Sequence, residues 1–215
     1  MRTIKFWICE NEKNQALNYP VKDLKNSLIE FKNGKFYFNS KFKNEPEEIK
    51  ITFSIFNFDE NLNKKVIQIL EESYKKAKLI SDEPISELNE NIFSEITTTI
   101  NKYSYEKCES VFYFVAELFY KYLMGHKLIN GNKRMSLMFL IFLLRFFGYH
   151  LPWSYGDRKD YKFYEDKLIK WVEIFQRNEN NCKINKNKNI ENIAEWIKKH
   201  SVIAIEFQYT KYYSL

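Results

Sequence analysis

Residues 125–149, GHKLINGNKRMSLMFLIFLLRFFGY, place a short polar turn directly before a strongly apolar segment. The apolar segment is far shorter than the roughly 20 residues of a membrane span, and it contains Arg145. A helix that is apolar nearly all round is instead typical of the interior of a helical bundle. We therefore predict a core helix that begins near Asn132 or Lys133, ends near Phe147 and is closed by the glycine that follows.

The rest of the chain predicts a mostly α-helical protein with a small β-containing part at its N-terminus. Apolar residues recur every three or four positions on both sides of the turn, and this spacing favours helices at 61–79, 87–102, 104–124, 158–177 and 189–200. Ser104 would cap the third of these helices, and Gly125 would end it in a left-handed conformation. β-Branched and aromatic residues favour strands at 3–9, 29–38 and 49–58, with a hairpin turn at Asn33-Gly34.

These elements suggest two parts of unequal size. Residues 1–58 would form the β-containing appendage, and residues 59–215 would form the helical domain. Within that domain we expect a core at 60–150 and further helices at 157–215, with a strand or an extended tail after residue 201.

Composition narrows the classes of function. The net charge is +6, but the lysines are interleaved with acidic residues, which indicates a solvated basic surface, so nucleic acid is not the expected partner. The apolar run at the N-terminus is too short for a signal peptide, and no membrane partner is expected. Cys9, Cys108 and Cys182 lie far apart without a Cys-x-x-Cys motif, so the sequence predicts neither a zinc site nor a disulfide framework. A reducing cytoplasm fits this pattern.

The polar turn has the chemistry of an anion site. The first N–H groups of a helix have no intrahelical acceptor, and the helix dipole places partial positive charge there. The run Asn130–Asn132, with glycine at its centre, would let the backbone approach an anion closely. Lys133 and Arg134 add positive charge, and His126 is a candidate base near neutral pH. Each feature alone is usual for a surface turn, but together they predict a phosphate site.

The same residues resemble a known family. HKLINGNKR, residues 126–134, is similar to the signature of the Fic/Doc family, which is roughly His-x-Phe-x-(acid or Asn)-(Gly or Ala)-Asn-(Gly or Lys)-Arg. The flanking pattern also agrees, because an aromatic-rich helix precedes the motif and an apolar helix ending in Arg-Phe-Phe-Gly-Tyr follows it. The resemblance is specific over about 108–150 and implies a Fic/Doc-type helical bundle. The matching positions are His126, Gly131, Asn132, Lys133 and Arg134.

The resemblance implies an ATP-dependent transferase that modifies a hydroxyl on a target protein, with ATP and Mg²⁺ as cofactors. His126 would be the general base, and Gly131 and Asn132 would form the nest for the nucleotide phosphates. Lys133 and Arg134 would neutralise phosphate charge, which is most of what phosphoryl transfer requires of a protein.

Two positions depart from the family pattern. Leu128 stands in place of the usual phenylalanine and is expected to anchor the turn in the core in the same way. Asn130 stands where many members carry the acidic residue that binds Mg²⁺. An asparagine offers an oxygen without a charge, so we expect weaker metal binding there.

Lys133 distinguishes between two reactions. It is the death-on-curing (Doc) variant of a position that is glycine in adenylylating Fic enzymes. The resemblance therefore favours phosphorylation over AMP transfer, although AMP transfer stays open as an alternative. A catalytically weakened nucleotide-binding module and an unrelated helical nucleic-acid-binding protein are two further alternatives.

The implied setting is a toxin of a bacterial toxin–antitoxin pair. The substrate would be a protein such as a translation factor, and an antitoxin segment near Arg134 would restrain the activity. The string Ser86–Asn91 also fits the pattern of an inhibitory helix found in some Fic proteins, (Ser or Thr)-x-x-x-Glu-(Gly or Asn). An ordinary solvated start of a helix would have the same appearance.

Overall fold

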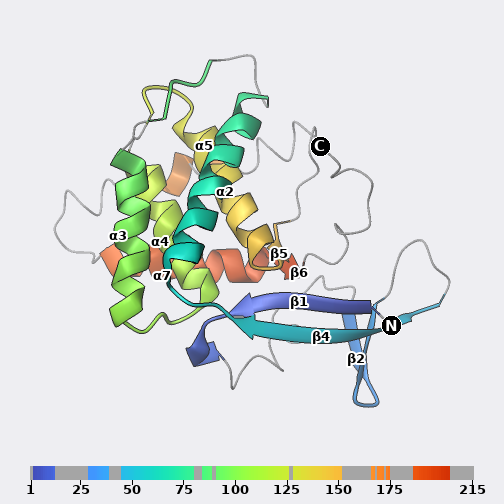
Figure 1. The fold of residues 1–215 in the computed structure, drawn as a ribbon. Helices are drawn as coiled ribbons and strands as arrows, with labels where there is room; N and C mark the ends of the chain where they lie inside the picture. Colours follow the sequence, from blue (N-terminus) through green and yellow to red (C-terminus); the bar gives the residue numbers. More distant parts are fainter. Residues whose placement is uncertain are drawn as a thin grey trace.

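A small sheet lies at one end of a helical bundle in the computed structural model (Figure 1). The structure describes residues 2–12, 29–38, 45–79, 84–88, 91–125, 128–151, 166–167, 169–171, 173–174 and 186–203. Within these residues the fold is mostly helical, as the sequence predicts.

The sheet has four strands in the order β1-β4-β3-β2. β1 runs parallel to β4, while β3 is antiparallel to both β2 and β4. Asn33 and Gly34 join β2 to β3 with φ values of 51° and 77°, which is the left-handed pair that an Asn-Gly hairpin turn requires. The predicted strands and hairpin are therefore confirmed. The strands are β1 (Arg2–Ile8), β2 (Ile29–Lys32), β3 (Lys35–Phe38) and β4 (Glu47–Ile55).

The helices follow the sheet along the chain. They are α2 (Glu60–Lys78), α3 (Asn91–Tyr105), α4 (Val111–Met124), α5 (Asn132–Phe146) and α7 (Lys186–His200). A short ladder, β5 (Tyr149–His150) with β6 (Val202–Ile203), joins the ends of α5 and α7. Most of the helix predicted at 158–177 and most of the tail lie outside the described residues, although those described between 166 and 174 are helical.

The boundary between α3 and α4 differs from the prediction. Ser104 lies inside α3, where its hydroxyl donates to the Phe58 carbonyl oxygen at 2.6 Å, so it does not cap a helix. The cap of α4 is Ser110, whose Oγ accepts from the Tyr113 N–H at 3.1 Å. Gly125 ends α4 with φ −72°, an ordinary right-handed value, so the predicted left-handed ending is wrong. The N–H of Gly125 continues the helical pattern by donating to the Lys121 carbonyl oxygen at 3.0 Å.

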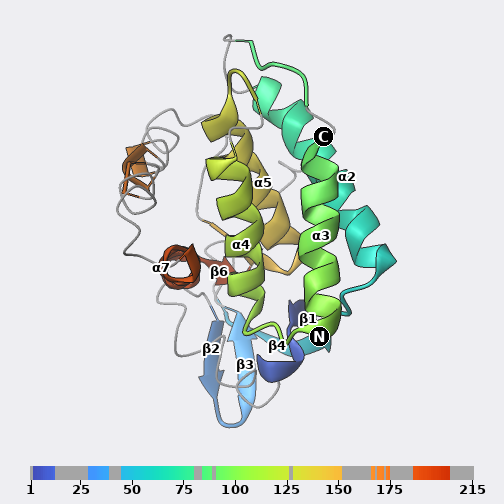
Figure 2. The ribbon, with the colours of Figure 1, turned by 90° about the vertical axis from the view of Figure 1, so that its left-hand side faces the viewer.

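The core forms around α5. Every residue from Arg134 to Ile141 is buried, because α2 and α4 cover this helix on two sides and β5 follows it (Figure 2). The sheet shares this core, with the Phe6 ring 5.9 Å from Tyr149 and the Phe56 ring 4.9 Å from Phe147. Sheet and helices therefore bury one continuous hydrophobic cluster.

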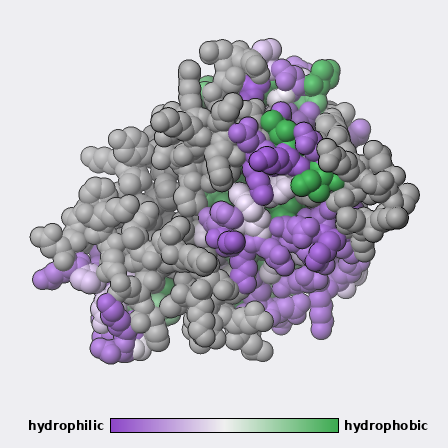
Figure 3. All heavy atoms as spheres, turned by 180° about the vertical axis from the view of Figure 1, so that it is seen from behind, coloured by the Kyte–Doolittle hydropathy of each residue, from purple (hydrophilic) through white to green (hydrophobic). Residues whose placement is uncertain are grey.

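The face seen in Figure 3 is mostly polar where the structure describes it. In Figure 3, hydrophilic side chains cover most of the described part of the rear face, and apolar ones gather in small areas of its upper half. Within the described ranges, no helix combines the length and apolarity that crossing a bilayer would need.

Gly148, just after α5, lies tightly against Phe6 of the sheet. Its φ is +91°, and an added Cβ would lie 2.8 Å from the Cβ of Phe6. Gly148→Ala should therefore lower the free energy of unfolding by roughly 2–4 kcal/mol, since left-handed strain adds to overpacking. Gly34→Ala is the matched control, because its φ is +77° with no neighbour within 4 Å. It should cost only about 1 kcal/mol. Urea denaturation measures both, and equal losses would contradict the role given to Gly148.

Candidate functional site

The polar turn lies at the end of the bundle opposite the sheet, between the end of α4 and the start of α5 (Figures 1 and 2). The structure describes its residues 128–131 and the whole of α5. The predicted base His126 and its neighbour Lys127 lie outside the described residues.

Gly131 sets the geometry of the start of α5. Its φ is +90°, in the left-handed region that favours glycine. A Cβ on this residue would lie 2.8 Å from Cγ1 of Ile85, so side-chain packing excludes larger residues as well. Gly131 makes no side-chain cap, and the first N–H groups of α5 have no intrahelical acceptor. Ile85 fills the space beside this glycine, so the expected close approach of an anion to its backbone stays a prediction.

The Asn132 side chain braces the turn. Its Oδ1 accepts from the Leu128 N–H at 2.8 Å, and its Nδ2 donates to the Leu128 carbonyl oxygen. Leu128 itself is 4% exposed, which confirms its expected role as the anchor of the turn. Because the Asn132 carboxamide is used in this way, the group of this residue best placed for an anion is its backbone N–H, in the first turn of α5.

Lys133 and Arg134 differ in their surroundings. Lys133 is half-buried, and its carbonyl oxygen accepts from the Ser136 hydroxyl at 2.9 Å. Arg134 is 5% exposed, so its side chain lies within the protein rather than on an open surface. In contrast to Arg134, Ile129 in the same turn is 98% exposed.

A segment distant in sequence, residues 84–88, contacts the turn. Ser86 Oγ accepts from the N–H groups of Ile129 at 2.9 Å and Asn130 at 3.5 Å. The Asn130 side chain donates through Nδ2 to the Pro84 carbonyl oxygen at 2.9 Å. The Tyr74 hydroxyl on α2 donates to the Ser86 carbonyl oxygen at 3.1 Å and so fixes the segment to the bundle.

This segment contains the start of the string that resembles an inhibitory motif. Ser86 is its first residue, and the structure brings it onto the backbone of the turn. Asn89 and the glutamate at position 90 lie outside the described residues, so a contact between that glutamate and Arg134 stays a prediction.

A hollow of about 370 Å³ lies beside the end of α4. Its lining includes Lys121, Lys186, Glu95, Tyr120 and Gly125, so two cations, one carboxylate and an aromatic ring lie beside the end of α4. Lys121 Nζ is held 3.0 Å from Glu117 Oε1, and it donates to Thr99 Oγ1 at 2.7 Å. The sequence gives no signal for this hollow, because Lys186 belongs to a helix more than 60 residues away along the chain.

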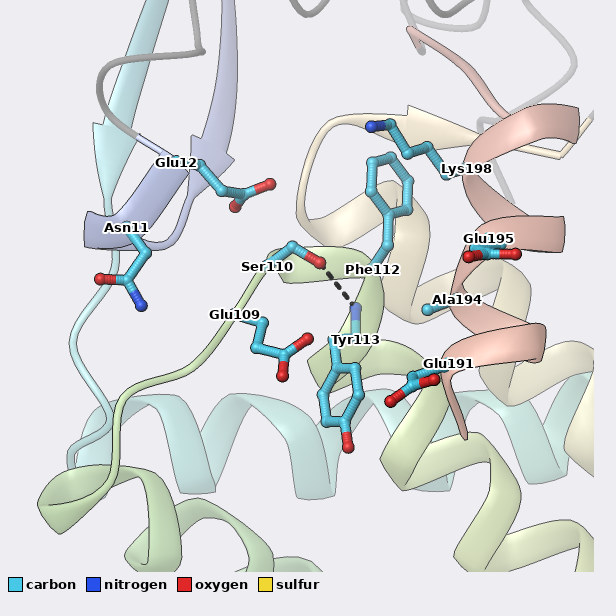
Figure 4. Close-up of a pocket in the computed structure, with 10 residues that line it drawn as sticks. All are labelled: Asn11, Glu12, Glu109, Ser110, Phe112, Tyr113, Glu191, Ala194, Glu195 and Lys198. Atoms are coloured by element: carbon cyan, nitrogen blue, oxygen red, sulfur yellow. Dashed lines mark hydrogen bonds between the residues drawn. The ribbon is translucent and has the colours of Figure 1, made fainter. Parts of the chain in front are cut away.

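A second hollow, of about 230 Å³, has the opposite charge (Figure 4). It lies at the start of α4, where Glu109 and Glu191 flank Tyr113. Among the described residues of the lining, Glu12 and Glu195 bring the carboxylates to four, and Lys198 is the one cation. Burial, together with the charges of Glu109 and nearby glutamates, raises the pKa of Tyr113 to about 12. An environment that disfavours a negative phenolate also disfavours phosphate, so this hollow is a poor place for a nucleotide.

No group of three or more histidine, cysteine, aspartate or glutamate side chains is arranged to hold a metal ion in the part of the chain that the structure describes. Comparison of the chain with protein-family models, with curated proteins and with solved structures gave no match.

The Ser86 hydroxyl should stabilise the contact between the segment 84–88 and the turn. Ser86→Ala removes the acceptor of two backbone N–H groups, at a cost of about 1–2 kcal/mol. Hydrogen exchange at the Ile129 and Asn130 amides should then accelerate by roughly 5- to 30-fold. Ser94→Ala is the control, because that exposed hydroxyl donates to Asn91 within α3 and does not contact the turn. Unchanged exchange in Ser86→Ala would show that other contacts hold the segment.

Proposed function

We propose that this protein is an ATP-dependent transferase of the Fic/Doc type that phosphorylates a hydroxyl on a target protein. The observation that supports this most is the left-handed Gly131 at the start of α5, where no side chain caps the helix and its first N–H groups have no intrahelical acceptor. Lys133 follows in the first turn, and two further cations line the hollow beside the end of α4.

The proposed reaction places each group in one role. His126 takes the proton from the attacking hydroxyl, whose oxygen forms a bond to the γ-phosphorus of ATP. The bond from that phosphorus to the bridging oxygen breaks, and ADP leaves with the electron pair. The N–H groups at the start of α5, with Lys133 and Arg134, stabilise the charge of the phosphates. AMP transfer, the alternative, would differ in attack at the α-phosphorus and release of pyrophosphate.

The turn is a poor site for Mg²⁺ by itself. Residues 128–134 contain no acidic side chain, and Asn130 uses its Nδ2 to bind Pro84. Mg²⁺ is usually held by one or two carboxylates together with the phosphates of the substrate. Because a single neutral oxygen does not supply this, no step of the proposed reaction is assigned to the metal.

A second candidate function is a nucleotide-binding module without transferase activity. The contact between Asn130 and Pro84 favours it, because the position expected to bind a metal instead holds the segment 84–88. In both cases the setting would be cytoplasmic, with a protein substrate or antitoxin as partner, such as a translation factor for the transferase.

Labelled ATP distinguishes these possibilities. The protein is incubated with magnesium, a bacterial lysate and ATP labelled at either the γ- or the α-phosphate. We expect transfer of label to a lysate protein from the γ-position alone, and loss of that transfer in His126→Ala. His200→Ala is the matched control, because His200 stacks on Trp196 at the end of α7, away from the turn.

The other outcomes are equally informative. Label from the α-position would support AMP transfer. ATP binding in calorimetry without any transfer would support the binding module. Transfer that persists in His126→Ala would contradict the transferase proposal.

The neutral side chain of Asn130 should weaken Mg²⁺ binding and so lower the rate of phosphate transfer at low Mg²⁺. Asn130→Asp adds the missing carboxylate, so we expect transfer to increase by roughly tenfold at low Mg²⁺, which corresponds to about 1.4 kcal/mol of added stabilisation. Asn130→Ala separates this effect from loss of the Pro84 contact, and it should not increase transfer. Rates across a Mg²⁺ titration measure the difference, and equal gains in both variants would contradict the metal explanation.

A further inference from the structure

Two cysteines that are 99 residues apart in sequence meet inside the protein. Cys9 follows β1, and Cys108 lies in the link between α3 and α4. Their Sγ atoms are 3.2 Å apart, and both thiols are free. The residues are 2% and 5% exposed, so the pair is enclosed by the protein. The spacing of the cysteines in the sequence gives no sign of this pair.

The backbone around the two sulfurs is fixed by other groups. Glu12 lies in the short 3-10 helix Glu10–Glu12 (η1), and its Oε2 accepts from the N–H of Cys9 at 2.8 Å and from the N–H of Val111 at 3.0 Å. Asn11 Nδ2 donates to the Cys108 carbonyl oxygen at 2.9 Å. These hydrogen bonds hold both cysteine-bearing segments together without the sulfurs. A disulfide bond is about 2.05 Å long, so the sulfurs must move roughly 1 Å closer to bond.

The two cysteines border a hollow at the protein surface. This open hollow, of about 650 Å³, is bounded by Cys9 and Cys108 together with residues of β4, α3 and their flanking segments. The hydrogen bond to Cys108, with burial and the nearby Glu12 carboxylate, raises the pKa of the Cys9 thiol. Cys9 therefore stays protonated near neutral pH and donates its hydrogen toward the Cys108 sulfur. The Cys108 sulfur accepts from Cys9, and its own thiol donates to the Ser110 carbonyl oxygen at 3.3 Å. The first reaction is assigned to Cys108.

We propose that Cys9 and Cys108 form a reversible thiol–disulfide site that is oxidised by peroxide. The Cys108 thiolate attacks one oxygen of hydrogen peroxide, which gives a sulfenic acid and releases hydroxide. The Cys9 sulfur, on losing its proton, attacks the Cys108 sulfur and expels the second hydroxide. The two thiol protons combine with the two hydroxide ions, so two thiols and one peroxide yield one disulfide and two waters. Small thiols reverse the reaction by exchange.

The bond would fasten the end of β1 to the segment that leads into α4. It closes a loop of about 100 residues, and such long loops gain most in the chain-entropy description of disulfides. The oxidised protein should therefore melt at a temperature about 10 °C higher than the reduced protein. The site uses none of the residues assigned to ATP, so it stands independently of the proposed function.

Peptide mapping tests the proposal directly. The folded protein is treated with hydrogen peroxide, alkylated, and digested without reduction. We expect a linked peptide that joins Cys9 to Cys108 in the monomer, one remaining alkylated thiol at Cys182, and recovery of all three thiols after dithiothreitol. The melting temperature should rise in the wild type and in Cys182→Ser, and should not rise in Cys9→Ser or Cys108→Ser.

The matched variants keep the outcome clear. Cys182→Ser retains the pair and serves as the control for the loss of any one thiol. The linked peptide is read from the wild type, so the test does not depend on the stability of a variant. Three alkylated thiols after peroxide treatment, a linked peptide that contains Cys182, or a Cys9–Cys108 link found only between two chains would overturn the proposal.

Discussion

Burial of α5 is the constraint on which the rest of the structure depends. Eight consecutive residues, Arg134–Ile141, are buried, so this helix needs neighbours on almost every side. α2 and α4 cover two of those sides, and the aromatic rings of the sheet and of β5 close the lower end. A helix enclosed in this way can expose polar groups only at its ends. The polar turn therefore lies where the start of α5 reaches the surface.

The start of α5 is shaped by groups from three separate parts of the chain. Gly131 packs on Ile85, Ser86 accepts from the N–H groups of the turn, and Tyr74 fixes Ser86 to α2. The Asn132 side chain braces the same turn from within. The segment 84–88 therefore contacts the surface to which the proposed anion would bind, and the two would compete for it.

The two ends of α4 lie in different chemical surroundings. Its last residues meet the turn and the basic hollow, while its first residues meet the acidic hollow, the Glu12 carboxylate and the cysteine pair. A helix of 14 residues spans about 21 Å. A charge or a bond at one end is therefore outside direct contact with groups at the other, and coupling between them would have to pass through the helix and its packing.

The sequence by itself determined the local structure of this protein. Apolar periodicity predicted α2, α5 and the α7 helix, Asn33-Gly34 predicted its hairpin, and rare residues marked the turn at 128–134. These signals come from neighbours in the chain, so they can be recognised without a fold. The predicted start of α4 was wrong because Ser104 and Ser110 carry the same local signal. The Ser104 hydroxyl donates to the Phe58 carbonyl oxygen, whereas Ser110 caps the helix.

Only the tertiary structure decided which distant groups meet. Ser86 on the turn, Lys186 beside the end of α4, Ile85 under Gly131 and Cys9 against Cys108 are all contacts across long stretches of chain. No local pattern encodes such pairs, because each arises from the way whole helices and strands pack around α5.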